Sequence, residues 1–137
     1  PPADTTLTIP STARSAITVG AYDPRLSSYA SFSGRGYTRI LHEIKPDLAA
    51  PGVNIPAPRS GGGYASFTGT SFATPFVSGS AALMMEWGIL RGNDPFLYGE
   101  KLKAYLIAGA KPIASESEYP NRRGGWGRLC LESSLPD

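Results

Sequence analysis

The feature that most constrains this chain is a glycine and a Thr-Ser pair directly before a long apolar stretch. Gly69, Thr70 and Ser71 precede residues 72–87, in which Glu86 is the one charged residue. Such a stretch predicts a helix buried on all sides, which Gly88 is expected to end. A serine at the start of a helix lies at the positive end of the dipole, beside backbone N–H groups that suit an oxyanion. The pattern favours acyl-transfer chemistry at Ser71, although helix capping is the commoner use of such a serine.

The rest of the sequence predicts several short strands and a second helix. Apolar runs bounded by Gly, Pro and Ser indicate strands or extended segments, which we expect within residues 17–22, 27–33, 45–53 and 61–67. Asp94 and Pro95 can begin a helix that runs to about Ala108 and ends at Gly109. Its expected apolar side consists of Leu97, Leu102, Tyr105 and Leu106.

Composition excludes several classes of function. The 137 residues carry 13 Lys and Arg against 11 Asp and Glu, scattered without a basic run, so we expect no nucleic-acid partner and no anionic membrane surface. The longest apolar stretch, at residues 81–85, is too short to span a bilayer. The single cysteine, Cys130, has no internal disulfide partner. We expect it to be a small buried hydrophobic residue rather than a reactive thiol.

Four segments together resemble one enzyme family. Residues 69–79 (GTSFATPFVSG) resemble the active-site serine block of the subtilisin-like serine proteases, the subtilases of peptidase family S8. Residues 12–21, 29–36 and 45–53 resemble further blocks of that family, in its order and spacing. The tail, with Trp87 and Trp126, is similar to clostridial subtilases of the Csp type, which act in spore germination. A secreted or spore-associated location is therefore expected.

The resemblance implies an α/β fold that is part of the subtilisin-like three-layer architecture. Parallel sheet strands, a buried serine-bearing helix and outer helices are expected. Residues 1–137 would form the C-terminal part of the catalytic domain. The catalytic Asp, the catalytic His and the oxyanion Asn would come from an N-terminal part upstream.

The resemblance also implies roles for individual residues. Ser71 would be the nucleophile and, with Thr70, would supply or assist the oxyanion site. The segment around Ile9-Pro10, with that bond cis, would lie against the primary specificity pocket, and Thr8 at its floor would disfavour large aromatic P1 residues. The expected pocket residues are Thr8, Ile9, Pro10, Thr68 and Gly69.

No cofactor follows from these segments, although a weak cation site is part of the resemblance. Carbonyls near Ser11, Ala13 and Ala16 match such a site in some relatives. No carboxylate cluster accompanies them, so no metal is predicted.

Two titratable residues are not expected to complete a triad. His42 lacks the family's His-Gly-Thr context and is predicted to be a surface-loop residue, and Asp47 belongs to a block that is structural in the family. The implied function is peptide-bond hydrolysis through an acyl-enzyme on Ser71, incomplete without the N-terminal part of the domain, so the isolated chain is expected to be inactive.

Two alternatives stay open. One is a non-catalytic, pseudoprotease-like module with a regulatory or scaffolding role. The other concerns partners: surfaces flanking residues 17–21 or 72–77 would be bare in the isolated chain, so self-association is expected there, and a monomer that repacks these surfaces is the alternative.

Overall fold

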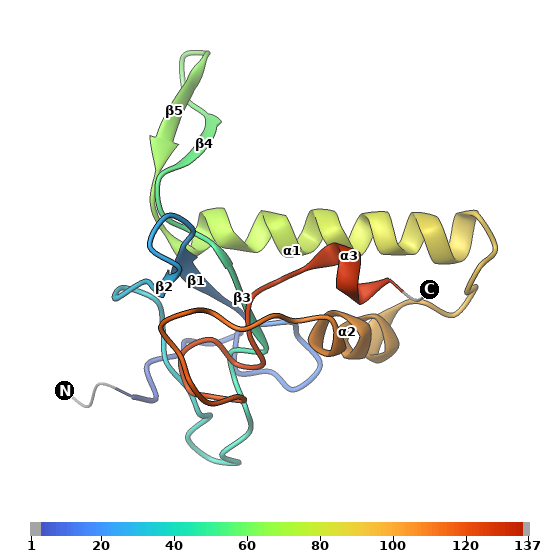
Figure 1. Ribbon diagram of the computed structural model, residues 1–137, viewed down its shortest axis with the longest axis horizontal. Helices are drawn as coiled ribbons and strands as arrows, with labels where there is room; N and C mark the ends of the chain where they lie inside the picture. Colours follow the sequence, from blue (N-terminus) through green and yellow to red (C-terminus); the bar gives the residue numbers. More distant parts are fainter. Residues whose placement is uncertain (1–3, 136–137) are drawn as a thin grey trace.

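The computed structural model describes residues 4–135, and its centre is a small sheet in the order β2-β1-β3. Strands β1 (Val19–Asp23) and β3 (Leu48–Pro51) pair in parallel, and β2 (Ser28–Tyr29) joins β1 antiparallel. Ala21, Leu48 and Ala50 lie in the core with no exposed surface. The small side chains of Ala21 and Ala50 allow a helix to approach the strands closely, and Figure 1 shows α1 crossing over β1 and β3.

Strands β4 (Ile55–Pro58) and β5 (Tyr64–Phe67) form an antiparallel hairpin that projects from the body (Figure 1). The sequence predicted β5 but not β4, because Pro56 and Pro58 cannot donate to a ladder. Each strand of a two-stranded ribbon has one unpaired side, which tolerates proline. The chain then enters α1 directly from β5.

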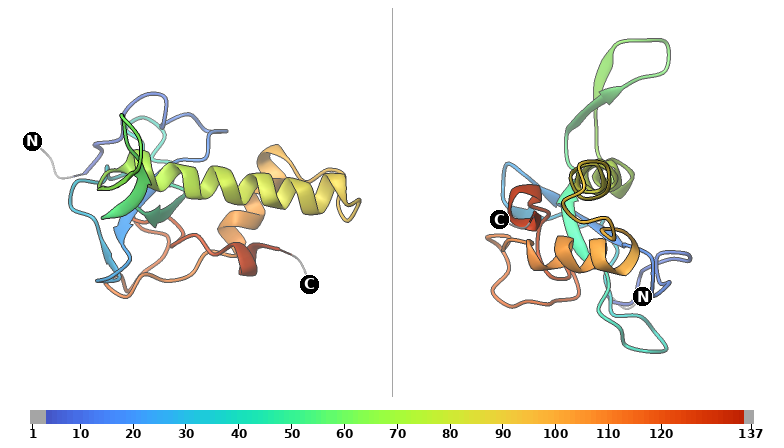
Figure 2. Two further views of the ribbon diagram at one scale, coloured as in Figure 1. Left: turned by 90° about the horizontal axis from the view of Figure 1, so that it is seen from above. Right: turned by 90° about the vertical axis from the view of Figure 1, so that its right-hand side faces the viewer.

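Helix α1 (Thr70–Met85) buries one stripe of residues rather than its whole circumference. The buried members, Ala73, Val77, Ser80 and Met84, recur every three or four residues, which places them on the face toward β1 and β3. Phe76 is 42% exposed and Leu83 54% exposed. The prediction of a helix buried on all sides is therefore wrong for the described residues, since the sheet covers only one face (Figure 2).

Gly88 does not end the helix. The chain continues as one turn of π-helix, η1 (Glu86–Leu90), and Gly88 lies buried within it. A Cβ atom there would lie 2.8 Å from the carbonyl oxygen of Asp94 and 2.9 Å from Leu97 Cβ. The glycine thus permits close packing of the following turn.

Helix α2 (Gly99–Ala108) starts later than Asp94. The carboxylate of Asp94 accepts a hydrogen bond from the N–H of Phe96 (3.2 Å) and holds a turn before the helix. Leu102 and Leu106 of α2 enter the same core cluster as α1. The short α3 (Leu131–Ser134) packs beside α2. The sheet, the serine-bearing helix and the outer helices confirm the predicted α/β architecture.

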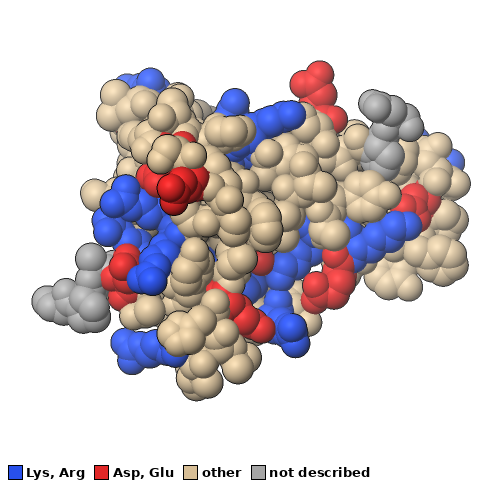
Figure 3. All heavy atoms as spheres, turned by 60° about the horizontal axis from the view of Figure 1, so that its bottom comes forward, with Lys and Arg blue, Asp and Glu red and all other residues tan. Residues whose placement is uncertain are grey.

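The surface shows no single-sign face in the view of Figure 3, where Lys and Arg lie beside Asp and Glu. Among residues 4–135, no helix combines the length and apolarity that a membrane span requires.

Candidate active site

Ser71 lies at the first turn of α1, where β5 gives way to the helix. Gly69 is the residue before the helix, with φ 157° and ψ 159°, and no side chain caps the helix end. Thr70 and Ser71 occupy the first two helical positions, whose backbone N–H groups have no intrahelical acceptor. The first turn contains no acidic residue, so nothing within it offsets the positive end of the dipole. Ser71 therefore does not serve as the helix cap.

The side chain of Ser71 is exposed and lines an open hollow of about 550 Å³. Three stretches of chain meet there: the first turn of α1, the N-terminal loop with the residues leading into β1, and the loop after β2. Thr70 and Thr74 contribute from the helix, and Phe32 from the loop. Apolar and hydroxyl groups dominate the lining, so the hollow suits an uncharged side chain.

Thr8 and Pro10 line the same hollow as Ser71, and the bond between Ile9 and Pro10 is cis, as predicted. The turn from Thr8 to Ser11 is closed by a hydrogen bond from the Ser11 N–H to the Thr8 carbonyl (2.9 Å). The chain thus brings two of the expected pocket residues beside the candidate nucleophile.

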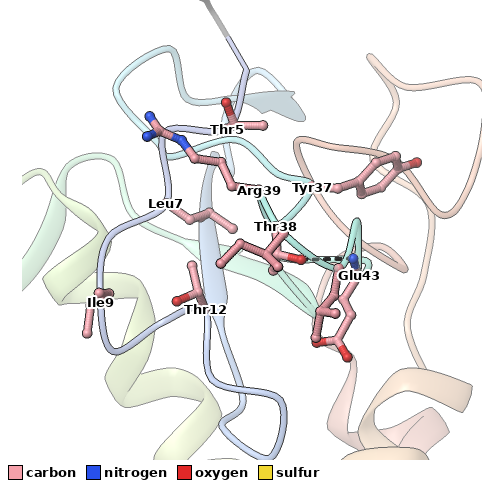
Figure 4. Close-up of a pocket in the computed structure, with 10 residues that line it drawn as sticks. Thr5, Leu7, Ile9, Thr12, Tyr37, Thr38, Arg39 and Glu43 are labelled. Atoms are coloured by element: carbon pink, nitrogen blue, oxygen red, sulfur yellow. Dashed lines mark hydrogen bonds between the residues drawn. The ribbon is translucent and has the colours of Figure 1, made fainter.

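Ile9 does not join them. It lines a second hollow, also about 550 Å³, together with Leu7, Thr12 and Thr38 (Figure 4). Its side chain is 88% exposed. Leu7 lines both hollows and so forms the wall between them. Thr8 and Pro10 face one side of this wall and Ile9 faces the other.

Thr68 and Gly69 support the site without lining the hollow. Thr68 Oγ1 accepts a hydrogen bond from the N–H of Asn54 (3.0 Å), which joins the start of β4 to the end of β5. Immediately around Ser71, the rings of Phe67 and Phe72 stack with their centroids 4.9 Å apart and an interplanar angle of 12°. The residues on either side of Ser71 in the sequence are thus held by a tied loop and by a stacked aromatic pair.

The expected site residues do not include most of the lining of the hollow, of which Phe32 and Thr74 are two examples. Thr74 follows Thr70 by one helical turn and donates its hydroxyl to the Thr70 carbonyl (3.0 Å), so helical periodicity could have identified it. Phe32 reaches the hollow from a loop distant in sequence, and no local pattern signals that contact.

No catalytic base is present beside Ser71 within residues 4–135. His42 is exposed in a loop, as predicted, with a positive φ of 49°, and it does not line the Ser71 hollow. Asp47 is buried and pairs with Lys45 Nζ (2.7 Å) and Lys103 Nζ (3.0 Å). Its carboxylate is committed to this ion cluster, which agrees with the expected structural role.

The carbonyls expected at a weak cation site already have donors. The Ala16 carbonyl accepts hydrogen bonds from Lys45 Nζ (2.6 Å) and Lys103 Nζ (3.2 Å). The Ala13 carbonyl accepts from the Ala16 N–H (3.3 Å), and the Ser11 carbonyl accepts from the Thr18 hydroxyl. Burial lowers the pKa of Lys45, although its hydrogen bond to Asp47 opposes that shift. Among residues 4–135, no three His, Cys, Asp or Glu side chains cluster as metal ligands.

Comparison with known proteins identifies the family. The model of the subtilase family, Peptidase S8, matches residues 1–127. The structure of the Clostridium perfringens CspB protease is 49% identical with a TM-score of 0.89, covering 94% of this chain and 27% of that one. Serine protease AprX of Bacillus subtilis is 34% identical over 155 residues, covering 98% of this chain and 33% of AprX. The minor extracellular protease Vpr of Bacillus subtilis is 35% identical over 114 residues, covering 77% of this chain and 13% of Vpr.

The chain thus spans about a third or less of the length of each of these relatives. The blocks that resemble the family lie in order along it, and they fold into the sheet and the serine-bearing helix described above. The chain belongs to the subtilase family of serine peptidases.

Proposed function

We propose that the protein is a serine endopeptidase in which Ser71 is the nucleophile. The observation that carries the proposal is the exposed Ser71 at the uncapped start of α1, in one hollow with Thr8 and Pro10. Peptide substrates would place the P1 side chain in this hollow. Thr8 would limit its depth.

In the proposed reaction, Ser71 Oγ attacks the carbonyl carbon of the scissile peptide bond. The hydroxyl proton passes to a general base, which returns it to the departing amine as the C–N bond breaks. Water then hydrolyses the resulting ester and regenerates the serine. The N–H of Ser71, assisted by Thr70, would stabilise the oxyanion at the positive end of α1.

The base and the orienting carboxylate would come from a part of the catalytic domain outside these 137 residues. His42 is exposed away from the hollow and Asp47 is held by two lysines. The same part of the domain would cover the apolar face of α1 that carries Phe76 and Leu83. Without that part of the domain, the chain would lack a base and would be inactive. It would also associate with itself through the bare surfaces flanking residues 17–21 or 72–77.

The test uses active-site labelling of the full-length protein. A fluorophosphonate reagent is expected to phosphonylate Ser71, and Ser71→Ala is expected to remove both the label and peptide hydrolysis. Ser117→Ala, at an exposed serine that does not line the Ser71 hollow, serves as the matched control and should retain both.

A folded protein that neither takes the label nor hydrolyses peptides would overturn the proposal in favour of a pseudoprotease-like module. We further propose that the protein is secreted or spore-associated. The relative Vpr, a minor extracellular protease, supports this location. Fractionation of the source cells tests it.

A further inference from the structure

Lys103 reaches from α2 into the loop that leads to β1 and binds three oxygens there. Its Nζ lies 2.8 Å from the Arg14 carbonyl, 3.2 Å from the Ala16 carbonyl and 3.0 Å from Asp47 Oδ1. The Lys103 side chain is 11% exposed and that of Asp47 is 4% exposed. An ammonium group therefore occupies a nearly enclosed position bounded by two carbonyls and a carboxylate.

Main-chain carbonyls and carboxylates are the oxygen ligands that hard metal cations take in proteins. The cation site expected from the family lies in this same loop, where the chain's own donors bind its carbonyls. The Ala16 carbonyl accepts from two ammonium groups, and the Ser11 and Ala13 carbonyls accept from Thr18 and Ala16. We propose that the Lys103 ammonium is a built-in cation that replaces a bound metal ion, and that removing it creates a site for a monovalent cation.

The charge of the cluster sets the valence of the ion. Lys45 and Lys103 carry two positive charges against the one negative charge of Asp47, and Lys45 remains bound to Asp47 Oδ2 at 2.7 Å. Loss of Lys103 lowers the local charge by one and leaves the Arg14 carbonyl without its ammonium donor. A potassium ion restores both, whereas a divalent ion would add excess charge beside the buried Lys45.

Because the cluster lies next to the loop that lines the Ser71 hollow, Lys103 also affects the position of that loop. The loop it holds runs from Pro10, which lines the hollow, to Thr18, whose N–H donates to Asp47 Oδ2 (2.7 Å). Lys103 thus ties α2 to the segment between the hollow and β1. With the cation covalently attached, this anchor does not depend on the ions in solution.

The test measures the thermal unfolding of the full-length Lys103→Ala variant in potassium chloride and in choline chloride at equal ionic strength. Equal ionic strength matters because general screening changes the strength of every ion pair. We expect the variant to have a lower Tm than the wild type in choline chloride. A saturable rise in Tm with potassium is then expected, as for a ligand that binds only the folded state. The wild type should have the same Tm in both salts.

Two further variants sharpen the result. Lys101→Ala removes an exposed lysine of the same helix, whose partner is Asp94 at 2.6 Å, and should show no potassium response. Lys103→Gln keeps an N–H donor in the position and should also show none, since its amide fills the site.

A potassium-specific rise in the Tm of the wild type would overturn the proposal. Equal Tm values of Lys103→Ala in the two salts would do the same. So would a Lys103→Ala variant that fails to fold in either salt, because the site would then not accept a free ion in place of the ammonium. None of these readouts depends on peptidase activity, so they are separable from the proposed function.

Discussion

The backbone N–H of Gly69, which lies two residues before Ser71, donates to the carbonyl of Gly52 at 2.8 Å. The N–H of Gly52 in turn donates to the Tyr22 carbonyl in β1 (3.0 Å). A continuous chain of backbone hydrogen bonds therefore links the end of the buried sheet to the start of α1. The position of Ser71 is set by the sheet through this link.

Replacing Gly52 should disturb that link. In Gly52→Ala, the added Cβ would lie 2.6 Å from Ala21 Cβ and 3.1 Å from the Gly69 carbonyl oxygen. Because Ala21 is fully buried in β1, the strain should fall on the loop that carries Gly69 and Ser71. We expect a loss of about 1–3 kcal/mol in the free energy of unfolding, typical of an overpacked core, with a fall in kcat at nearly unchanged KM.

Denaturant unfolding and peptide hydrolysis by the full-length protein measure both effects. Ala104→Ser, on the exposed side of α2, is the control and should leave stability and kcat near those of the wild type. A Gly52→Ala protein with wild-type kcat would show that the loop absorbs the added carbon without moving Ser71.

Patterns within short stretches of sequence predicted those parts of the site that a single stretch of chain forms. A glycine, a Thr-Ser pair and small apolar residues were sufficient to place the start of α1 and to put Ser71 on its first turn. The cis bond before Pro10 and the exposed position of His42 followed from the resemblance and its departures.

Contacts between distant segments were not predictable in the same way. The wall formed by Leu7, which separates Ile9 from Thr8, depends on how the N-terminal loop meets residues 37–43. The ammonium of Lys103 meets the Arg14 carbonyl across 89 residues of sequence. Helix α1 was expected to be buried on all sides because its sequence is apolar throughout. A hydrophobic pattern does not show which neighbouring segment covers each side of a helix.

Thr8 provides a prediction about specificity. Its side chain lines the hollow beside Ser71, so Thr8→Gly should deepen the pocket. The kcat/KM ratio for P1 phenylalanine over P1 alanine is expected to rise about 10-fold or more, since a single methylene in an apolar pocket already contributes about 10-fold. Thr12→Gly, in the same loop but lining the other hollow, should leave the ratio unchanged. An equal rise in both variants would point to loop flexibility instead.

Asp47 provides a prediction about stability. Its carboxylate pairs with two largely buried ammonium groups, Lys45 Nζ at 2.7 Å and Lys103 Nζ at 3.0 Å. Asp47→Asn should cost about 3–5 kcal/mol in the free energy of unfolding, because it leaves buried positive charge unpaired. Asp94→Asn breaks a pair with Lys101, whose side chain is 43% exposed, and should change stability much less because solvent screens that pair. Similar losses in the two variants, by urea denaturation, would contradict the assignment of Asp47 as the buried counter-ion.

The single cysteine gives a prediction that needs neither substrate nor the rest of the domain. Cys130 is half-buried rather than fully buried as expected, and its Sγ lies 3.4 Å from Ser133 Oγ. In the neutral form the Cys130 thiol donates to Ser133 Oγ. Once ionised, the sulfur accepts hydrogen bonds from the side chain and backbone of Ser133, which lowers the pKa of the Cys130 thiol below its ordinary value of 9.0, because donors to the thiolate favour it.

The thiolate is the form that reacts with iodoacetamide, so the alkylation rate of this sole cysteine reports its ionisation directly. We expect the rate to rise with pH through a midpoint below 9.0 in the wild type, and the midpoint to move upward in Ser133→Ala. Ser134→Ala is the matched control, since its hydroxyl donates to the Cys130 carbonyl (2.9 Å) and not to the sulfur. A midpoint that stays in place in Ser133→Ala, or that moves equally in the control, would show that the Ser133 hydroxyl does not set the acidity of Cys130.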